Sequence, residues 1–168
     1  MKRFVELRIC LTIVLTCYII FGMFALTACG EEEEPPYEPP KNCDVVLEQK
    51  GYDWGEKYSA FIEVCDSYSE ICEKLKNHGL ESWNNDKVRE YADEHAKDKS
   101  FVVCFYGESG DGGQQRLREI EVNGGKLTMY IWYERRDYSN CVIINRLFIA
   151  GVDKSFVANV TECEYEFV

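Results

Sequence analysis

The sequence lacks the residue patterns on which most enzyme active sites are built. It has only two histidines, His78 and His95, and neither stands in a motif typical of a catalytic base or a metal ligand. The serines form no Gly-x-Ser-x-Gly turn, and the glycines form neither a Walker loop nor a dinucleotide-binding motif. No zinc-ligand spacing of cysteines occurs. The sequence therefore predicts no catalytic residue, no metal site and no cofactor.

Basic residues are also scarce. The chain has 19 Lys and Arg against 30 Asp and Glu, which gives a net charge of −11. Residues 1–28 hold three of the basic residues and one acid, so the rest of the chain is more acidic still. Nucleic-acid binding needs a basic surface, so nucleic acid is excluded as a partner. The acidity favours solubility and the binding of basic partners.

The N-terminus has the layout of an export signal. Lys2, Arg3 and Arg8 precede an uncharged stretch, residues 9–28. This stretch is also long enough to span a bilayer, which takes about 20 apolar residues. The basic start keeps the N-terminus in the cytoplasm and places the rest of the chain on the extracytoplasmic face of the cell membrane. The layout leaves open a cleaved signal and an uncleaved anchor.

The residues around Cys29 favour cleavage. Leu26-Thr27-Ala28-Cys29 resembles a bacterial lipobox, in which the cysteine thiol receives a diacylglyceryl group and becomes the first residue of the mature chain. We therefore predict that residues 1–28 are a lipoprotein signal peptide and that Cys29 is the lipid attachment site. Two or more acyl chains would hold the protein stably at the membrane.

An acidic, proline-rich run follows the predicted lipid site. All four prolines of the chain lie between residues 35 and 40, directly after four adjacent glutamates. Like charges repel one another and proline forbids regular structure, so this run favours an extended chain. We expect residues 29–42 to be a tether and residues 43–168 to form a single domain.

The predicted domain has an even number of cysteines. An exported domain with six cysteines can form up to three disulfides, in any of 15 pairings. Most of these cysteines lie in apolar runs such as "FVVCFY", where a thiol acts as a small buried hydrophobe. The sequence favours mostly structural thiols, with room for one disulfide, and leaves the pairing open. The six are Cys43, Cys65, Cys72, Cys104, Cys141 and Cys163.

The first half of the domain combines strand and helix patterns. Ser67 and Glu70 form a capping box at the start of a helical pattern, and Gly79 is a typical helix terminator. A second helical pattern carries Val88 and Ala92 on its apolar face. We expect strands over residues 43–52 and 57–67 and helices over residues 67–79 and 85–96.

Strand patterns dominate from residue 100 onward. Ser100–Glu108 is nearly all apolar, which is typical of a central strand buried on both faces. Asn123-Gly124 is a strong hairpin signal. Further strands are expected over residues 126–134 and 141–151, with one or two more after residue 154. The predicted fold class is α+β: a meandering, mainly antiparallel sheet with two short helices inserted between its early and late strands.

The order of these segments resembles a known family. The segments are "KDKSFVVCFYGE", "GESGDGGQQRLREIEV", "NGGKLTMYIWYE" and "NCVIINRLFIAGVDKSFV", preceded by two short helices. In this order they are similar to the C-terminal domain of PrcB-type protease-complex accessory subunits, over residues 57–160. Gln114 stands after Gly112-Gly113 where the family commonly has an aromatic residue. The resemblance implies a non-catalytic accessory or binding domain.

The candidate recognition residues are aromatic and basic. Alternation along residues 126–134 places Tyr130 and Trp132 on one face of a strand, and Tyr138, Arg135 and Arg136 follow in the next turn. Exposed aromatic residues often anchor protein partners or flat sugar rings, although such residues more often cover a half-buried sheet face beneath helices.

We therefore expect an extracytoplasmic binding or accessory lipoprotein whose partner is another exported protein. Two alternatives stay open. One is a cell-envelope hydrolase that uses paired carboxylates, and the other is a solute-binding module that uses Tyr130 and Trp132.

Overall fold

The computed structural model describes residues 38–53, 59–83, 85–109, 113–134 and 143–168, which belong to one compact unit. Cys29, Arg135, Arg136, Tyr138 and Cys141 lie outside the described residues. The elements are β1 (Asp44–Asp53), β2 (Phe61–Cys65), α2 (Tyr68–Asn77), η1 (Glu81–Trp83), α3 (Asp86–His95), β3 (Lys99–Ser109), β4 (Gln115–Asn123), β5 (Lys126–Tyr133), β6 (Ile143–Asp153), α4 (Lys154–Val157) and β7 (Glu162–Phe167).

The strands form two sheets. Four strands pair antiparallel in the order β1-β6-β3-β2, and three pair in the order β4-β5-β7. Within the second sheet β4 and β5 are antiparallel, whereas β5 and β7 are parallel. The α+β class with mainly antiparallel strands is confirmed. The expected single meander is wrong, because strands far apart in the sequence pair with one another and divide the strands between two sheets.

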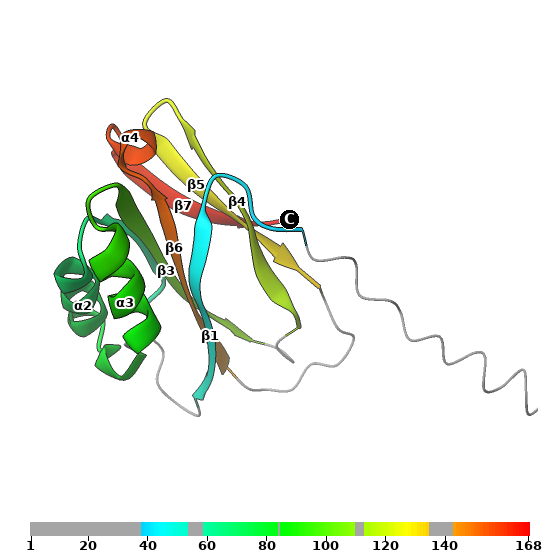
Figure 1. Ribbon diagram of the computed structural model, residues 1–168. Helices are drawn as coiled ribbons and strands as arrows, with labels where there is room; N and C mark the ends of the chain where they lie inside the picture. The colour runs from blue at the N-terminus through cyan, green and yellow to red at the C-terminus, as the bar shows by residue number, and fades with distance from the viewer. Residues whose placement is uncertain (1–37, 54–58, 84, 110–112, 135–142) are drawn as a thin grey trace, which may run out of the picture. The chain divides into compact units, whose positions relative to one another are not determined.

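The four-stranded sheet is buried on both faces, as Figure 1 shows: α2 and α3 cover one face, and the three-stranded sheet packs on the other. Alternation along β3 produces this arrangement. Phe101, Val103 and Phe105 pack against the helices, while Val102 and Cys104 point into the core between the sheets. The expectation that Ser100–Glu108 is a central strand is therefore confirmed.

Local capping signals set the ends of α2. The Ser67 hydroxyl accepts a hydrogen bond from the Glu70 backbone N–H at 3.3 Å. The Glu70 carboxylate accepts one in return from the backbone N–H of Asp66, one residue before the cap, at 2.7 Å. At the other end Gly79 has a φ of +73°, and the Leu80 N–H donates to the Leu75 carbonyl at 2.7 Å. Both predicted helix boundaries hold.

The other local signals are also confirmed. The Asn85 side chain caps α3 by accepting a hydrogen bond from the Lys87 N–H at 2.9 Å. Gly124 and Gly125 both have positive φ in the turn between β4 and β5, which is typical of a two-residue hairpin. The start of the segment after residue 154 forms the short helix α4, so β7 is the only strand that the described chain has after β6.

The end of the predicted tether already contacts the domain. The Lys41 N–H donates to the Arg118 carbonyl at 3.0 Å, and the Lys41 carbonyl accepts from the Ile120 N–H at 3.2 Å. On β1, the Glu48 carboxylate accepts a hydrogen bond from the Leu117 N–H at 3.0 Å. This bond falls where the β4 register shifts, between Leu117 and Glu119. The start of the domain therefore joins the two sheets along one edge.

Candidate functional site

The outer face of the β4-β5-β7 sheet combines aromatic and acidic side chains. The strand register aligns them in rows across the three strands. One row is Glu119, Tyr130 and Glu166, and the next is Glu121, Thr128 and Glu164. We call this surface the glutamate–aromatic face. Its members are Arg116, Glu119, Glu121, Lys126, Thr128, Tyr130, Trp132, Glu162, Glu164 and Glu166.

Tyr130 and Trp132 lie on this face with no helix of the described chain over them. Both are partly exposed, whereas Leu127, Met129 and Ile131 alternate with them and are buried in the core between the sheets. The helices α2 and α3 pack on the other sheet (Figure 1). The predicted placement of the two aromatic residues on one face is confirmed.

Polar contacts fix the row at Thr128. Lys126 Nζ lies 2.6 Å from Glu164 Oε1, and the Thr128 hydroxyl donates to the same oxygen at 3.1 Å. The Lys126 hydrogen bond holds the pKa of Glu164 below its usual value. The Tyr130 hydroxyl donates to Glu121 Oε2 at 3.3 Å, so the Tyr130 ring leans toward this row. Desolvation, followed by the charge of Glu121, raises the pKa of Tyr130.

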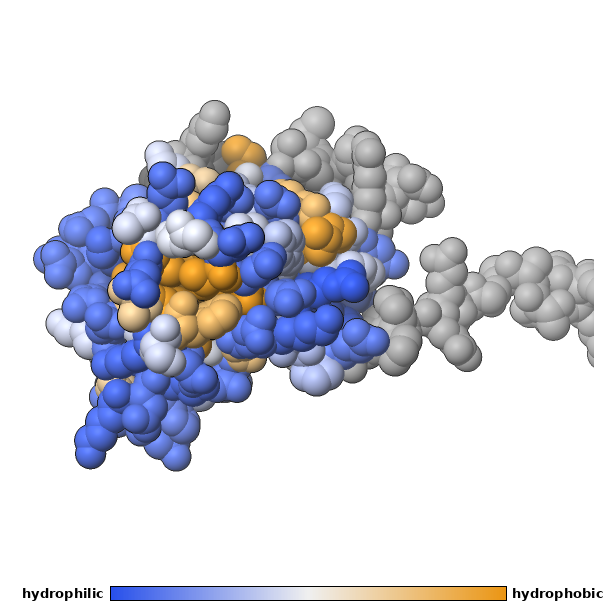
Figure 2. All heavy atoms as spheres, turned by 90° about the horizontal axis from the view of Figure 1, so that it is seen from above, coloured by the Kyte–Doolittle hydropathy of each residue, from blue (hydrophilic) through white to orange (hydrophobic). Residues whose placement is uncertain are grey.

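The row at Tyr130 carries two negative charges. Glu119 and Glu166 stand on the two strands that flank Tyr130. Neither carboxylate forms a hydrogen bond or an ion pair with another described residue. Lys41 pairs with Glu119 in an isolated bridge at the β4 edge and adds a third basic residue to Arg116 and Lys126. Five glutamates against three basic residues leave the glutamate–aromatic face acidic. The view in Figure 2, which looks down on the molecule from above, shows mostly hydrophilic atoms, with one larger hydrophobic area and smaller ones apart from it.

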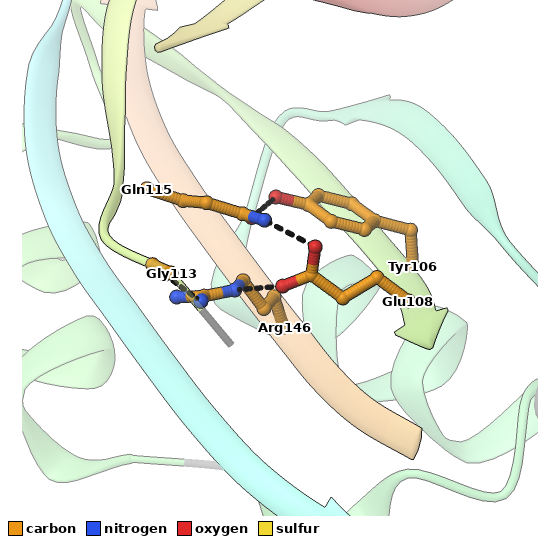
Figure 3. A network of polar contacts seen from close by, with 5 residues as sticks. All are labelled: Tyr106, Glu108, Gly113, Gln115 and Arg146. Atoms are coloured by element: carbon orange, nitrogen blue, oxygen red, sulfur yellow. Dashed lines mark hydrogen bonds and ion pairs between the residues drawn. The ribbon is translucent and has the colours of Figure 1, made fainter. Parts of the chain in front are cut away.

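A buried polar network lies inside the domain at the ends of three strands (Figure 3). Arg146 Nε on β6 lies 2.9 Å from Glu108 Oε1 on β3, and the two side chains are only 8% and 16% exposed. Arg146 Nη2 also donates to the Gly113 carbonyl at 2.5 Å. Gln115 Nε2 on β4 donates to Glu108 Oε2 at 2.5 Å, and the Tyr106 hydroxyl donates to Gln115 Oε1. The network joins the two sheets.

This network was not predicted from the sequence. Its signal was Arg146, a charged residue inside the apolar run "VIINRLFIAG". A charged side chain in such a run requires a buried partner. The partner could not be named, because Glu108 is 38 residues away and many other carboxylates were available.

Aromatic rings surround Tyr106. Its ring stacks on Tyr165 with centroids 5.0 Å apart and meets Phe167 edge-on at 5.4 Å. Phe167 also contacts Tyr133, with centroids 5.8 Å apart. Burial raises the pKa of Tyr106 above its usual range, so its hydroxyl stays protonated and serves as a donor. This end of the core is therefore largely aromatic.

Two carboxylates line a hollow of about 360 Å³ near α4. Lys99 Nζ lies between them, 3.1 Å from Asp44 Oδ2 and 2.9 Å from Asp153 Oδ1. The Tyr91 hydroxyl also donates to Asp44 at 2.7 Å and holds the pKa of Asp44 below its usual value. A carboxylate pair that acts in hydrolysis needs one member with a raised pKa. The contacts to Asp44 have the opposite effect.

None of the five described cysteines is in a disulfide. Cys104 is fully buried and Cys65 nearly so, which confirms the structural role expected for them. Burial raises the pKa of Cys65 to about 12, so its thiol is not a nucleophile near neutral pH. No group of three or more histidines, cysteines and acids that could hold a metal ion occurs among the described residues. None of the helices described is long and apolar enough to cross a membrane.

The remaining predicted site residues cannot be placed. Arg135, Arg136 and Tyr138 lie outside the described residues, as does Cys29. Comparison with known proteins gives no match to any family model, curated protein or solved structure. The resemblance to PrcB-type subunits therefore stays a prediction.

Proposed function

We propose that this protein is a lipid-anchored, extracytoplasmic binding protein that recognises another exported protein through its glutamate–aromatic face. The observation that supports this proposal is the row at Tyr130. An aromatic ring stands there between two carboxylates that have no partner among the described residues. A ring face attracts cations, and flanking carboxylates strengthen that attraction. The partner surface is therefore basic.

The resemblance to PrcB-type domains supports a more specific proposal, in which the partner belongs to an exported protease complex. In that role the domain carries no chemistry of its own and positions or regulates the protease. The solute-binding alternative uses the same two aromatic residues. It would not require the carboxylates on either side of Tyr130.

Site-specific photo-crosslinking on intact cells tests the binding proposal. A photoreactive phenylalanine analogue at Trp132 reports on contacts of the glutamate–aromatic face, and the same analogue at Glu73, exposed on α2, is the matched control. We expect a discrete crosslinked protein from position 132 and none from position 73. A chain that stays uncrosslinked at Trp132, or that crosslinks equally from both positions, would contradict the proposal.

Lipid attachment at Cys29 is tested by replacing the thiol. We expect Cys29→Ser to abolish incorporation of a clickable fatty acid and to block signal cleavage, which leaves a larger chain on a denaturing gel. Cys17→Ser, inside the uncharged stretch, is the control and should change neither. If Cys29→Ser keeps both the lipid label and the wild-type size, the segment is not a lipobox.

A further inference from the structure

We infer that the occupant of the glutamate–aromatic face is an extended segment of the partner with two basic side chains at alternate positions, lying along β5. This inference rests on the proposed function and deepens it. It follows from how the rows repeat, which of them carry unpaired charge, and what stands at each end of the face.

The spacing of the rows matches an extended chain. The rows at Tyr130 and Thr128 are two residues apart along β5, which is about 6.7 Å in a strand. Every second side chain of an extended segment repeats at the same distance and points the same way. Successive turns of a helix repeat at about 5.4 Å, so a helix would lose register with the rows.

The width of the rows also suits an extended chain. Glu119 and Glu166 lie two strands apart, which is about 9.6 Å across the sheet, with Tyr130 between them. A helix is about 10–12 Å wide with its side chains and would rest on top of the two glutamates. One extended backbone is narrower and can lie along the β5 side chains, where it directs a lysine or arginine onto the Tyr130 ring.

The charges define where the two cations sit. The first lies over Tyr130, between the carboxylates of Glu119 and Glu166, which have no partner among the described residues. The second lies at the next row, where Thr128 is buried, and meets the exposed carboxylate of Glu121. Glu164 in that row is already paired with Lys126.

The two ends of the face limit the basic stretch to these two positions. Lys126 ends the face on the hairpin side and would repel a third cation there. On the other side Arg116 stands opposite Trp132. An uncharged, apolar side chain therefore suits the position over Trp132.

Binding of synthetic peptides to the full chain in zwitterionic detergent tests this inference. One peptide carries lysines at two alternate positions, threonine between them, and valine two residues before the first lysine. A second peptide of the same composition has adjacent lysines. The four glutamates after Cys29 attract both peptides equally, so the difference in affinity reports on the glutamate–aromatic face. We expect the alternating peptide to bind about fivefold more tightly or better, with a preference that weakens as salt rises.

Paired variants locate the binding. We expect Glu119→Gln with Glu166→Gln to lower the affinity for the alternating peptide about tenfold. The double variant Glu73→Gln/Glu90→Gln makes the same charge change on exposed positions of α2 and α3. It should alter the affinity for the alternating peptide less than about twofold. Tyr130→Leu should lower it about threefold, whereas Tyr130→Phe keeps the ring and should preserve it.

The outcomes separate this inference from the proposed function. Equal affinity for the two peptides, or an equal loss from both pairs of glutamine variants, overturns the alternating basic segment. If crosslinks from Trp132 still form in that case, the face binds a partner of another shape and the proposed function stands. If no such crosslink forms, the proposed function itself fails.

Discussion

Arg146 shows how a single buried charge can hold two sheets together. Its guanidinium contacts the Glu108 carboxylate on the adjacent strand and the Gly113 carbonyl just before β4. Gln115 completes the set by bonding to both Glu108 and Tyr106. Such a network favours one arrangement of the sheets only while every member is satisfied. Removing one member leaves the others buried without partners.

We predict that Arg146→Met destabilises the domain by about 3–5 kcal/mol, because the nearly buried Glu108 carboxylate loses its counterion. Urea unfolding followed by circular dichroism measures the change. The control is Arg89→Met, which breaks the exposed pair with Asp86 on α3 and should cost less than about 1 kcal/mol. Equal losses in the two variants would show that the buried network contributes no more than a surface ion pair.

At the scale of elements, local signals were sufficient for the helices and the hairpin. The bonds that end α2 involve residues within five positions of one another, so Ser67, Glu70 and Gly79 could be read directly from the sequence. The same holds for the glycines between β4 and β5.

These local signals could not predict which strands pair. β1 pairs with β6 and β5 pairs in parallel with β7, across long stretches of chain. The alternation of side chains along a strand indicates which of its faces is buried. It does not indicate which other strands pair with it. The single meander was expected for this reason.

The same limit applies to the candidate site: one part of it could be predicted from the sequence and another part could not. Alternation along β5 placed Tyr130 and Trp132 on one face correctly. The glutamates that flank Tyr130 come from β4 and β7, so they could be assigned to this face only once the pairing was known.

The cap of α2 gives a prediction at this scale. Ser67→Ala removes the acceptor for the Glu70 N–H and should cost about 1 kcal/mol of unfolding free energy. Ser69→Ala, exposed in the first turn of the same helix, is the matched control and should be neutral or slightly stabilising. Chemical unfolding of both variants measures the difference. A loss in Ser69→Ala as large as that in Ser67→Ala would mean that the cap bond contributes nothing.

At the scale of the whole molecule, the two outer surfaces differ: one is formed by the helices and the other by the glutamate–aromatic face. The helices cover one face of the four-stranded sheet and bury the residues that stabilise the fold. The β4-β5-β7 sheet uses its inner face for the second core and leaves its outer face to the glutamates and aromatic residues. The two surfaces are separated by both sheets. Substitutions on the glutamate–aromatic face should therefore change binding with little effect on the core.

The buried thiols make stability depend on pH. Cys65 lies in the core beneath the helices, and Cys104 lies in the core between the sheets. Burial raises the pKa of both thiols, that of Cys65 to about 12. An exposed thiol in the unfolded chain titrates near 9.0. The stabilising contribution is thus complete below pH 9, and it is lost as the pH rises from there toward 12.

We predict that Cys65→Ala reduces this alkaline loss. The variant should be less stable than the wild type at neutral pH, because it leaves a small cavity in the core. Between neutrality and about pH 10, its unfolding free energy should fall by about 1.4 kcal/mol less than that of the wild type, since one titrating thiol is absent. Urea unfolding at a series of pH values under reducing conditions gives both quantities. Parallel pH profiles for the two chains would mean that the Cys65 thiol titrates alike in the folded and unfolded states.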